Sequence, residues 1–319
     1  MKSICYIVIP CYNEEEVLPE TAKRMQVKMN TLIESGMIDA ESRILFVDDG
    51  SKDKTWEYIK TLHEQNSLFS GLKLSRNKGH QNALLAGLMA AKERADAIIS
   101  MDADLQDDIN AIDEMIMKYH EGCDIVYGVR KKRETDSFFK RVTAEAFYRL
   151  MNHLGANTVF NHADYRLMSK RAVEALAEFK EVNLFLRGIV PMIGFRTDTV
   201  LYDRCERFAG KSKYPLKKML SFAFEGITSL STKPIRMITV LGLTIFILSG
   251  IMLLYVLISH FAGHTMPGWS SMTASVWVIG GLTLFSIGIV GEYIGKIYLE
   301  TKQRPRFFVD ELLDDNHKD

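Results

Sequence analysis

The sequence predicts an α/β fold, in which a sheet with helices on both faces is followed by membrane-associated helices. Two features of the chain predict it. Short apolar runs alternate with amphipathic stretches up to about residue 130. Further on, Met237–Ser259 and Trp269–Gly291 each hold 23 residues without Asp, Glu, Lys or Arg. Strands and helices that alternate at this spacing are typical of a parallel sheet covered on both faces, and apolar runs of this length can cross a bilayer core of about 30 Å.

The elements of the first part follow in order from these patterns. The predicted strands are the apolar runs Ser3–Pro10, Arg43–Asp48, Gly71–Ser75, Ala97–Asp102 and Asp124–Gly128. The predicted helices lie between them at Glu15–Ser35, Lys54–Gln65, Lys78–Arg94 and Ile109–Glu121. Ligands of such sheets bind at the carboxyl ends of the strands, and polar clusters of this chain follow directly after the first, second and fourth strands.

Composition excludes several classes of protein. The 319 residues carry 40 Lys and Arg against 40 Asp and Glu, and this balance argues against a general nucleic-acid-binding surface. The four cysteines contain no CxxC pair and no metal-ligand spacing. We therefore expect incidental thiols in a reducing compartment and no nucleic-acid partner.

The two apolar runs predict a transmembrane hairpin. Basic residues lie before the first run and after the second, whereas the loop 260–268 contains no Lys or Arg. By the positive-inside rule, the soluble head and both termini face the cytoplasm and the protein is a multi-pass membrane protein. Ile4–Ile9 is too short for a signal peptide. Two buried helices of a soluble protein are the alternative, but both runs are too long and too apolar on every side for it.

The region between the alternating part and the apolar runs contains two further amphipathic segments, Ser137–Leu154 and Pro215–Ser231. For the first, core packing and an interfacial helix are equally compatible with the pattern. Lysines in and before the second favour contact with anionic lipid or a phosphate headgroup. We thus divide the chain into a cytoplasmic head with interface helices (1–233), a transmembrane hairpin (234–298) and a cytoplasmic tail (299–319).

Asp102-Ala103-Asp104 is the sharpest local signal for chemistry. Alternate side chains of an extended segment share a face, so the two carboxylates can hold a divalent cation such as Mg²⁺ or Mn²⁺ at the end of the strand. Gln106 can supply a further oxygen ligand. A solvated turn is the alternative for a lone motif of this kind.

The clusters after the first two strands also allow two interpretations. Each is typical of an ordinary strand-to-helix turn with local capping. Alternatively, Asp49 accepts hydrogen bonds from a base or ribose, the Tyr12 ring stacks on a nucleobase, and Glu14 reaches the ribose or base.

Taken together, the motifs resemble those of a known family. IVIPCYNEEEVLP, VDDGSKDKT, SRNKGHQNALLAGL and MDADLQDD, in this order and spacing, are similar to family 2 glycosyltransferases. The stretches NHADYRLMSKRAVEAL, ERFAGKSKYPLKKML and GEYIGKIYLETKQRPRFFV, with the two apolar runs, narrow the resemblance to polyprenyl-phosphate glycosyltransferases akin to bactoprenol glucosyltransferases and dolichyl-phosphate mannose synthase. It covers almost the whole chain.

The resemblance implies a GT-A fold, a nucleotide-sugar donor and a role for each matching residue. The nucleotide-binding set would be Pro10, Tyr12, Glu14, Val47 and Asp49. The metal- and diphosphate-binding set would be Asp102, Ala103, Asp104 and Gln106. Arg130 and Asp164 would serve catalysis, Arg130 at the reacting phosphates and Asp164 on the acceptor side. Arg141, Arg207, Ser212 and Lys213 would bind the acceptor phosphate. Two departures are that many relatives have Pro after the DxDxQ segment, where this chain has Asp107-Asp108, and Glu where it has Lys211.

The implied reaction is an inverting transfer of a sugar to polyprenyl phosphate, such as undecaprenyl phosphate, at the cytoplasmic membrane face. UDP is the preferred nucleotide by analogy. A phosphate monoester is mostly ionised near neutral pH, since its second pKa is roughly 6, so Asp164 is expected to position groups more than to act as a strong base. The product would serve glycan or wall-polymer decoration. The family also implies a homo-oligomer, such as a tetramer, and a flippase partner.

Two other functions compete with this interpretation. A processive polysaccharide synthase of the same superfamily would carry a Gln-x-x-Arg-Trp motif, but no Trp of this chain follows an Arg. A catalytically silent membrane partner of a flippase or polymer-assembly complex would be expected to lose the metal-binding carboxylates, which this chain retains.

Overall fold

The computed structural model describes residues 2–131, 162–182, 184–203 and 268–314, with isolated positions between 235 and 258. Its internal contacts divide the chain into two units. The first contains all the strands of the sheet, and the second contains the long helix α10 (Trp269–Lys302).

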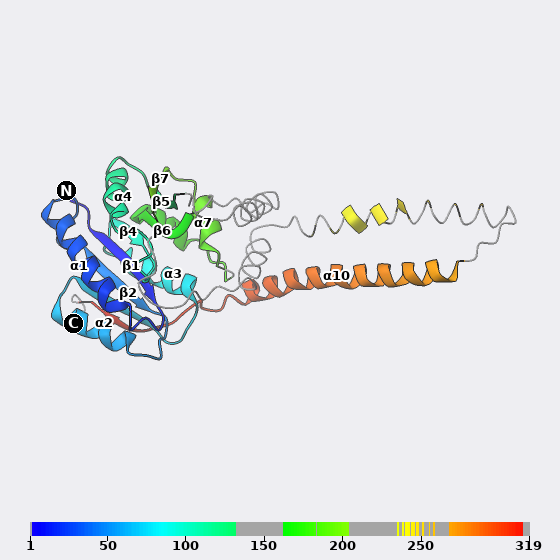
Figure 1. Cartoon of the computed structure of the whole chain (residues 1–319), viewed down its shortest axis with the longest axis horizontal. Coiled ribbons are helices and arrows are strands. Elements are labelled where there is room, and N and C mark those ends of the chain that lie inside the picture. The colour runs from blue at the N-terminus through cyan, green and yellow to red at the C-terminus, as the bar shows by residue number, and fades with distance from the viewer. Residues whose placement is uncertain are drawn as a thin grey trace. The chain divides into compact units, whose positions relative to one another are not determined.

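The first part of the head alternates strands and helices as the sequence predicts (Figure 1). The strands are β1 (Cys5–Cys11), β2 (Arg43–Asp48), β3 (Phe69–Leu74), β4 (Ala97–Ser100) and β5 (Ile125–Arg130). The helices are α1 (Leu18–Glu34), α2 (Thr55–Gln65), α3 (His80–Ala91) and α4 (Ala111–His120). β1 pairs in parallel with β2 and β4, and β2 pairs in parallel with β3. Their carboxyl ends therefore meet at one edge of the sheet, as predicted.

The sheet as a whole is mixed, which corrects the expectation of a parallel sheet. Within the described residues, eight strands form the order β7-β5-β6-β4-β1-β2-β3-β8. The elements that complete it are β6 (His162–Ser169), α6 (Lys170–Ala177), α7 (Leu186–Met192), β7 (Thr197–Tyr202) and β8 (Val309–Leu313). β6 lies between β4 and β5 and is antiparallel to both. Because β6 comes later in the sequence than either neighbour, the local alternation of the first part could not predict it.

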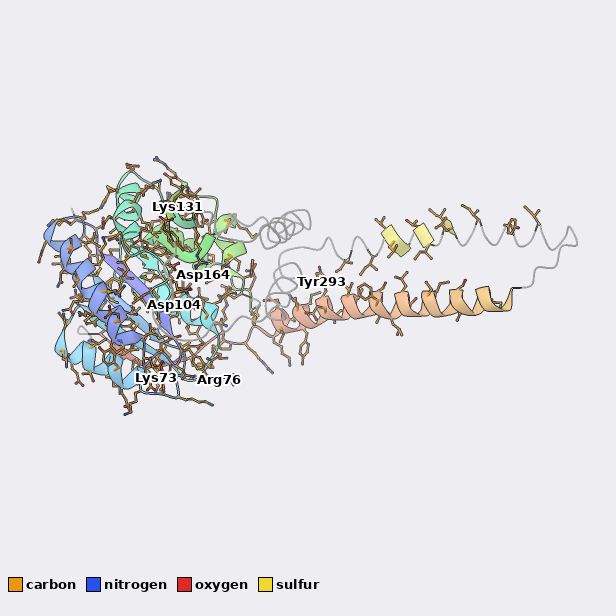
Figure 2. The ribbon with its side chains drawn as sticks, viewed as in Figure 1. Lys73, Arg76, Asp104, Lys131, Asp164 and Tyr293 are labelled. Atoms are coloured by element: carbon orange, nitrogen blue, oxygen red, sulfur yellow. The ribbon has the colours of Figure 1, made fainter. Side chains whose placement is uncertain are left out.

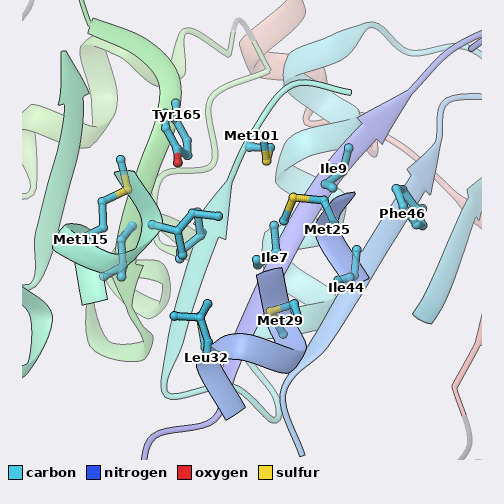
Figure 3. Packing of buried hydrophobic residues seen from close by; sticks show 14 of the residues in the cluster. Ile7, Ile9, Met25, Met29, Leu32, Ile44, Phe46, Met101, Met115 and Tyr165 are labelled. Carbon is cyan, nitrogen blue, oxygen red and sulfur yellow. The ribbon is translucent and has the colours of Figure 1, made fainter. Parts of the chain in front are cut away.

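Two apolar layers cover the faces of this sheet. Alternate residues of β1 point to opposite faces, so Ile7 and Ile9 join one buried cluster while Val8 joins the other. Helices α1, α2 and α4 contribute to the first cluster, and α3, α6 and α7 to the second. Figure 3 shows Met25 and Met29 of α1 packed over the strand residues of the first cluster. These layers hold the strands in place, and the loops at their carboxyl ends carry candidate site residues.

The last strand lies far along the chain from the rest of the head. Within residues 299–319, which the sequence predicts as a tail, Val309–Leu313 forms β8, antiparallel to β3. Trp56 Nε1 donates to Glu311 Oε2 at 3.1 Å, and Lys60 pairs with the same carboxylate. Leu313 packs against the first apolar cluster. The chain that follows α10 therefore covers the edge of β3.

The second unit supports one of the two predicted spans. Within α10, Val278–Lys302 has a mean hydropathy of 1.6 and is almost entirely exposed, and it is the single stretch of the described residues that is long and apolar enough to cross a membrane. Only isolated positions of the first predicted span, Met237–Ser259, are described. The amphipathic segments Ser137–Leu154 and Pro215–Ser231 lie outside the described residues.

Candidate functional site

The loops after β1 and β2 are joined by hydrogen bonds between side chains and backbone. The Asn13 amide N–H donates to Ser51 Oγ at 2.9 Å, and the Lys52 N–H donates to Asn13 Oδ1 at 2.9 Å. Asn13 has a φ of 52°, a left-handed conformation that Asn tolerates. The Glu14 N–H donates to Thr55 Oγ1 at 3.0 Å. These contacts shape the loop that carries Tyr12, which directly follows β1 and is 38% exposed.

Asp49 is engaged by the backbone more fully than the sequence suggested. Its two carboxylate oxygens accept the N–H groups of Lys78 at 2.7 Å and Gly79 at 2.9 Å. Burial raises the pKa of Asp49, and those two hydrogen bonds oppose the rise. The carboxylate thus fixes the loop before α3, and a ligand would have to share oxygens that already accept hydrogen bonds.

Pro10 and Val47 are buried within their strands. Val47 is 0% exposed, and a Cβ built on Gly87 of α3 would lie 2.7 Å from its side chain. The Val47 side chain is therefore part of the core. The predicted role of Pro10 and Val47 in holding the nucleotide stays a prediction.

Hydrogen bonds to its backbone shape the loop after β4, which carries the predicted metal ligands. The Ala103 carbonyl accepts the Thr21 hydroxyl at 2.8 Å, Leu105 adopts a φ of 56°, and the Gln106 N–H donates to Asp104 Oδ1 at 3.2 Å. Asp104 and Asp164 are labelled in Figure 2. Desolvation raises the pKa of Asp102, and the nearby His80 lowers it. The negative charges of Asp107, Asp164 and Asp104 raise this pKa further.

This electrostatic setting fits a divalent cation, because such an ion would offset the repulsion among neighbouring carboxylates. Oxygen atoms from carboxylates and amides are also the ligands that Mg²⁺ and Mn²⁺ prefer. Among the described residues, no group of three or more His, Cys, Asp or Glu side chains is arranged to hold a metal ion. The predicted ligand set, with the carboxylates of Asp102 and Asp104 and the amide oxygen of Gln106, stays a prediction.

Strand β6 brings Asp164 to the same edge. Ser100 at the end of β4 pairs with Arg166, so continuing the antiparallel register by two residues aligns Asp102 with Asp164. Arg166 Nη2 donates to Asp164 Oδ1 at 2.6 Å, and Arg187 Nη2 donates to Oδ2 at 3.0 Å. Burial alone would raise the pKa of Asp164, but the charges of Arg187 and Arg166 outweigh it and hold this pKa well below its usual range.

Two residues of this cluster were not assigned from the sequence. His80, the first residue of α3, places Nε2 at 3.6 Å from Asp102 Oδ1 and 3.7 Å from Asp164 Oδ2. Arg187 comes from α7, in a stretch without a recognised motif. His80 lies within the SRNKGHQ motif, and this was the one available signal for it. Arg187 offered none, because its position depends on how α7 packs.

Arg130 lies at the end of β5, and its guanidinium group is occupied. It donates from Nη2 to Asp107 Oδ1 at 3.3 Å and from Nε to the Tyr202 hydroxyl at 3.1 Å. Its predicted contact with the reacting phosphates stays a prediction. The four predicted acceptor-phosphate ligands, Arg141, Arg207, Ser212 and Lys213, lie outside the described residues.

Comparison with known proteins identifies the family of this chain. Residues 6–177 match the family described as Glycosyl transferase family 2, and residues 233–297 match a family described as the GtrB C-terminal hairpin. The first match covers more than half of the chain. The chain belongs to glycosyltransferase family 2, and it is a transferase.

Individual relatives extend the likeness over nearly the full length. The chain is 58% identical to a Bacillus subtilis protein named uncharacterized glycosyltransferase YkoT, with 95% of this chain and 90% of that protein covered. It is 40% identical to the bactoprenol glucosyl transferase of Shigella phage SfX, with 95% and 97% covered. Among solved structures, the mannosyltransferase PcManGT of Pyrobaculum calidifontis matches with a TM-score of 0.44 and 14% identity, covering 94% of this chain and 85% of that one.

Proposed function

We propose that the protein transfers a sugar from a nucleotide sugar, with UDP as the preferred nucleotide, to polyprenyl phosphate at the cytoplasmic face of the membrane. The observation that carries this proposal is the match to bactoprenol glucosyl transferases at about 40% identity over nearly the whole of both chains. The apolar stretch Val278–Lys302 supports it, since an acceptor with a lipid tail requires an enzyme held at the membrane. The second span and the cytoplasmic placement of both termini belong to the same proposal.

In the proposed reaction, an oxygen of the acceptor phosphate attacks the anomeric carbon of the sugar. A new carbon–oxygen bond forms as the bond from the sugar to the nucleoside diphosphate breaks, and the diphosphate leaves with the electron pair. This direct displacement inverts the anomeric configuration. The attacking oxygen needs no deprotonation, because a phosphate monoester has a second pKa of roughly 6.

The side chains of the site suit this chemistry through charge. Two phosphate-bearing reactants repel each other, and cationic groups at the site reduce that repulsion. Asp164 orients Arg187 and Arg166, while Asp102, Asp104 and Gln106 would hold Mg²⁺ or Mn²⁺. Such an ion, when bound, would neutralise negative charge on the departing diphosphate. We assign Asp164 to positioning, because its lowered pKa makes it a poor proton acceptor.

The proposal places the product on the route to an exported glycan. A sugar linked to lipid phosphate on the cytoplasmic side would have to be moved across the membrane by a flippase, and a transferase on the far side would consume it. Oligomer formation, for example as a tetramer, remains part of the proposal by analogy with the family.

A donor panel tests the proposal. Purified protein in detergent receives undecaprenyl phosphate, labelled UDP- and GDP-sugars, and Mn²⁺, Mg²⁺ or EDTA. We expect a lipid-linked product from one donor that EDTA abolishes. The Asp104→Ala variant should lose metal-dependent UDP binding as well. A wild-type protein that makes no lipid product and binds no nucleotide would favour the silent membrane partner instead.

A further inference from the structure

Three side chains from separate elements form a connected cluster beside the predicted metal loop. Asp107 directly follows Gln106, Arg130 ends β5 and Tyr202 ends β7, where the parallel register pairs it with Arg130. The Tyr202 hydroxyl donates to Asp107 Oδ1 at 2.5 Å, and Arg130 Nη2 donates to the same oxygen at 3.3 Å. Arg130 Nε closes the cluster by donating to the Tyr202 oxygen at 3.1 Å.

The cluster is more than a surface ion pair. The Asp107 side chain is 1% exposed, whereas that of Arg130 is 26% exposed. Burial and the Asp107 charge raise the pKa of Tyr202, so that its hydroxyl stays protonated and donates. The Tyr165 ring packs edge-on against Tyr202 with centroids 5.3 Å apart. The buried end of the cluster is thus fixed, and Arg130 is its more exposed member.

The bonding of Asp107 is unusual for a residue that serves stability alone. Among the described residues, its second carboxylate oxygen, Oδ2, is buried and has no hydrogen-bond partner. Buried polar atoms are nearly always paired, and a buried ion pair is often no more stabilising than apolar residues of similar volume. A buried carboxylate with one oxygen satisfied therefore points to a role in orienting its partner.

We propose that Asp107 and Tyr202 are positioning residues that orient the Arg130 guanidinium group toward phosphate oxygens of the reactants. This inference rests on the proposed function. Guanidinium binds phosphate through a planar fork of donors, so its orientation matters as well as its charge. The loop predicted to hold the diphosphate and cation also carries Asp107, so loading that loop and aligning Arg130 are mechanically linked.

A double-mutant cycle tests the inference. Asp107→Asn and Tyr202→Phe are made alone and together with Arg130→Ala, and kcat and KM are measured for each substrate. Affinities for UDP with Mn²⁺ and for undecaprenyl phosphate in detergent are measured in parallel. We expect each single change to reduce kcat/KM about tenfold, the range seen when supporting residues of a site are removed. Neither change should reduce it further once Arg130 is Ala.

The phosphate that Arg130 binds can belong to the donor or to the acceptor, and the change in KM and affinity for each substrate distinguishes them. A higher KM and weaker affinity for the donor nucleotide assign Arg130 to the diphosphate, whereas the same changes for undecaprenyl phosphate assign it to the acceptor. Tyr202→Phe removes a single oxygen and keeps the aromatic ring, so it tests the inference even if Asp107→Asn fails to fold.

Asp124→Asn is the matched control. Asp124 is also a buried carboxylate paired with an arginine, Arg171, but it lies just before β5, at the opposite end of the strand from Arg130. It should leave kcat/KM unchanged. The inference is overturned if Asp107→Asn or Tyr202→Phe still lowers kcat/KM in the Arg130→Ala background, or if Asp124→Asn lowers kcat/KM as much as they do. In either case, sugar transfer by the wild-type protein would still support the proposed function. If wild type binds UDP without transferring sugar, the proposed function fails and the cycle is judged on the two affinities.

Discussion

Asp164 accepts hydrogen bonds from two arginines, and those contacts determine what its carboxylate can do. Arg166 is 2% exposed at its side chain and has Asp164 as its ion-pair partner. Arg187 is 35% exposed and bonds to the other oxygen of the same carboxylate. A carboxylate that is held ionised in this way is a weak base at neutral pH, and it suits a reaction whose nucleophile is already ionised.

Replacing Asp164 with Asn should destabilise the fold. The change leaves the Arg166 charge buried without a counter-charge, and breaking a buried pair typically costs about 3 kcal/mol or more. The free energy of unfolding in urea, measured in detergent, checks this. Asp203→Asn is the control, because the Lys131–Asp203 pair is 51% and 77% exposed and should contribute less than about 1 kcal/mol. Equal losses in the free energy of unfolding for Asp164→Asn and Asp203→Asn would contradict a stabilising role of the buried Asp164–Arg166 pair.

The pH dependence of transfer should report the acceptor and not Asp164. Because the folded pKa of Asp164 is depressed, the stability from its ionised form is present above the unfolded value of about 3.9 and is lost only as pH falls toward the folded pKa. We therefore expect kcat/KM for polyprenyl phosphate to fall below about pH 6, as the acceptor is protonated. A small residual activity of Asp164→Asn should keep this acid limb. Its disappearance in that variant would identify Asp164 as the titrating base.

At the scale of elements, the turn after β2 depends on a glycine. Gly50 has a φ of +65°, and a Cβ there would lie 2.6 Å from backbone atoms of Arg76 and Asn77. Gly79 has a φ of +87°, but nothing lies within 4 Å of its Cβ position. Gly79→Ala should cost about 1–3 kcal/mol through backbone strain alone, because its φ of 87° and ψ of 154° lie in a region that is essentially restricted to glycine. Gly50→Ala should cost clearly more in the same unfolding measurement, because the backbone of the next loop must also move; equal costs would show that this close approach is unimportant.

Strand β8 should contribute to the stability of the head. A chain that ends before Val309 loses the pairing with β3 and leaves Trp56 without the Glu311 acceptor. We expect a lower midpoint of thermal unfolding for this truncation, followed by tryptophan fluorescence. A chain that ends at Asp314 retains β8 and should unfold like the full protein. If the two truncations unfold alike, β8 does not stabilise the sheet.

The elements that follow local patterns were predictable, and those that depend on long-range pairing were not. β1 to β4 and α1 to α4 match the predicted ranges within a few residues, because each is marked in its own sequence by an apolar run or by helical spacing. β6 lies between β4 and β5, and nothing in its own sequence specifies those neighbours. The same limit applies to the site. The motif Asp102-Ala103-Asp104 was visible in the sequence, whereas the contacts of Asp164 with Arg187 and of Arg130 with Asp107 depend on packing.

The whole molecule combines a glycosyltransferase head with an apolar helical segment. Val278–Lys302 spans 25 residues, about 38 Å at 1.5 Å per residue, which exceeds the thickness of a bilayer core. The match to the GtrB C-terminal hairpin over residues 233–297 includes both predicted spans and supports the proposed hairpin. This arrangement suits a lipid acceptor, because the phosphate of such an acceptor lies at the membrane surface while its tail stays in the hydrocarbon.

We propose that an ionised lipid phosphate is the nucleophile, and an assay with two paired acceptors tests this role. The protein is given its labelled nucleotide sugar and divalent cation with either undecaprenyl phosphate or undecaprenol, which has a hydroxyl group in place of the phosphate. We expect lipid-linked sugar from undecaprenyl phosphate alone, and NMR should show the inverted configuration. Transfer to undecaprenol at a comparable rate, or a product with retained configuration, would contradict it.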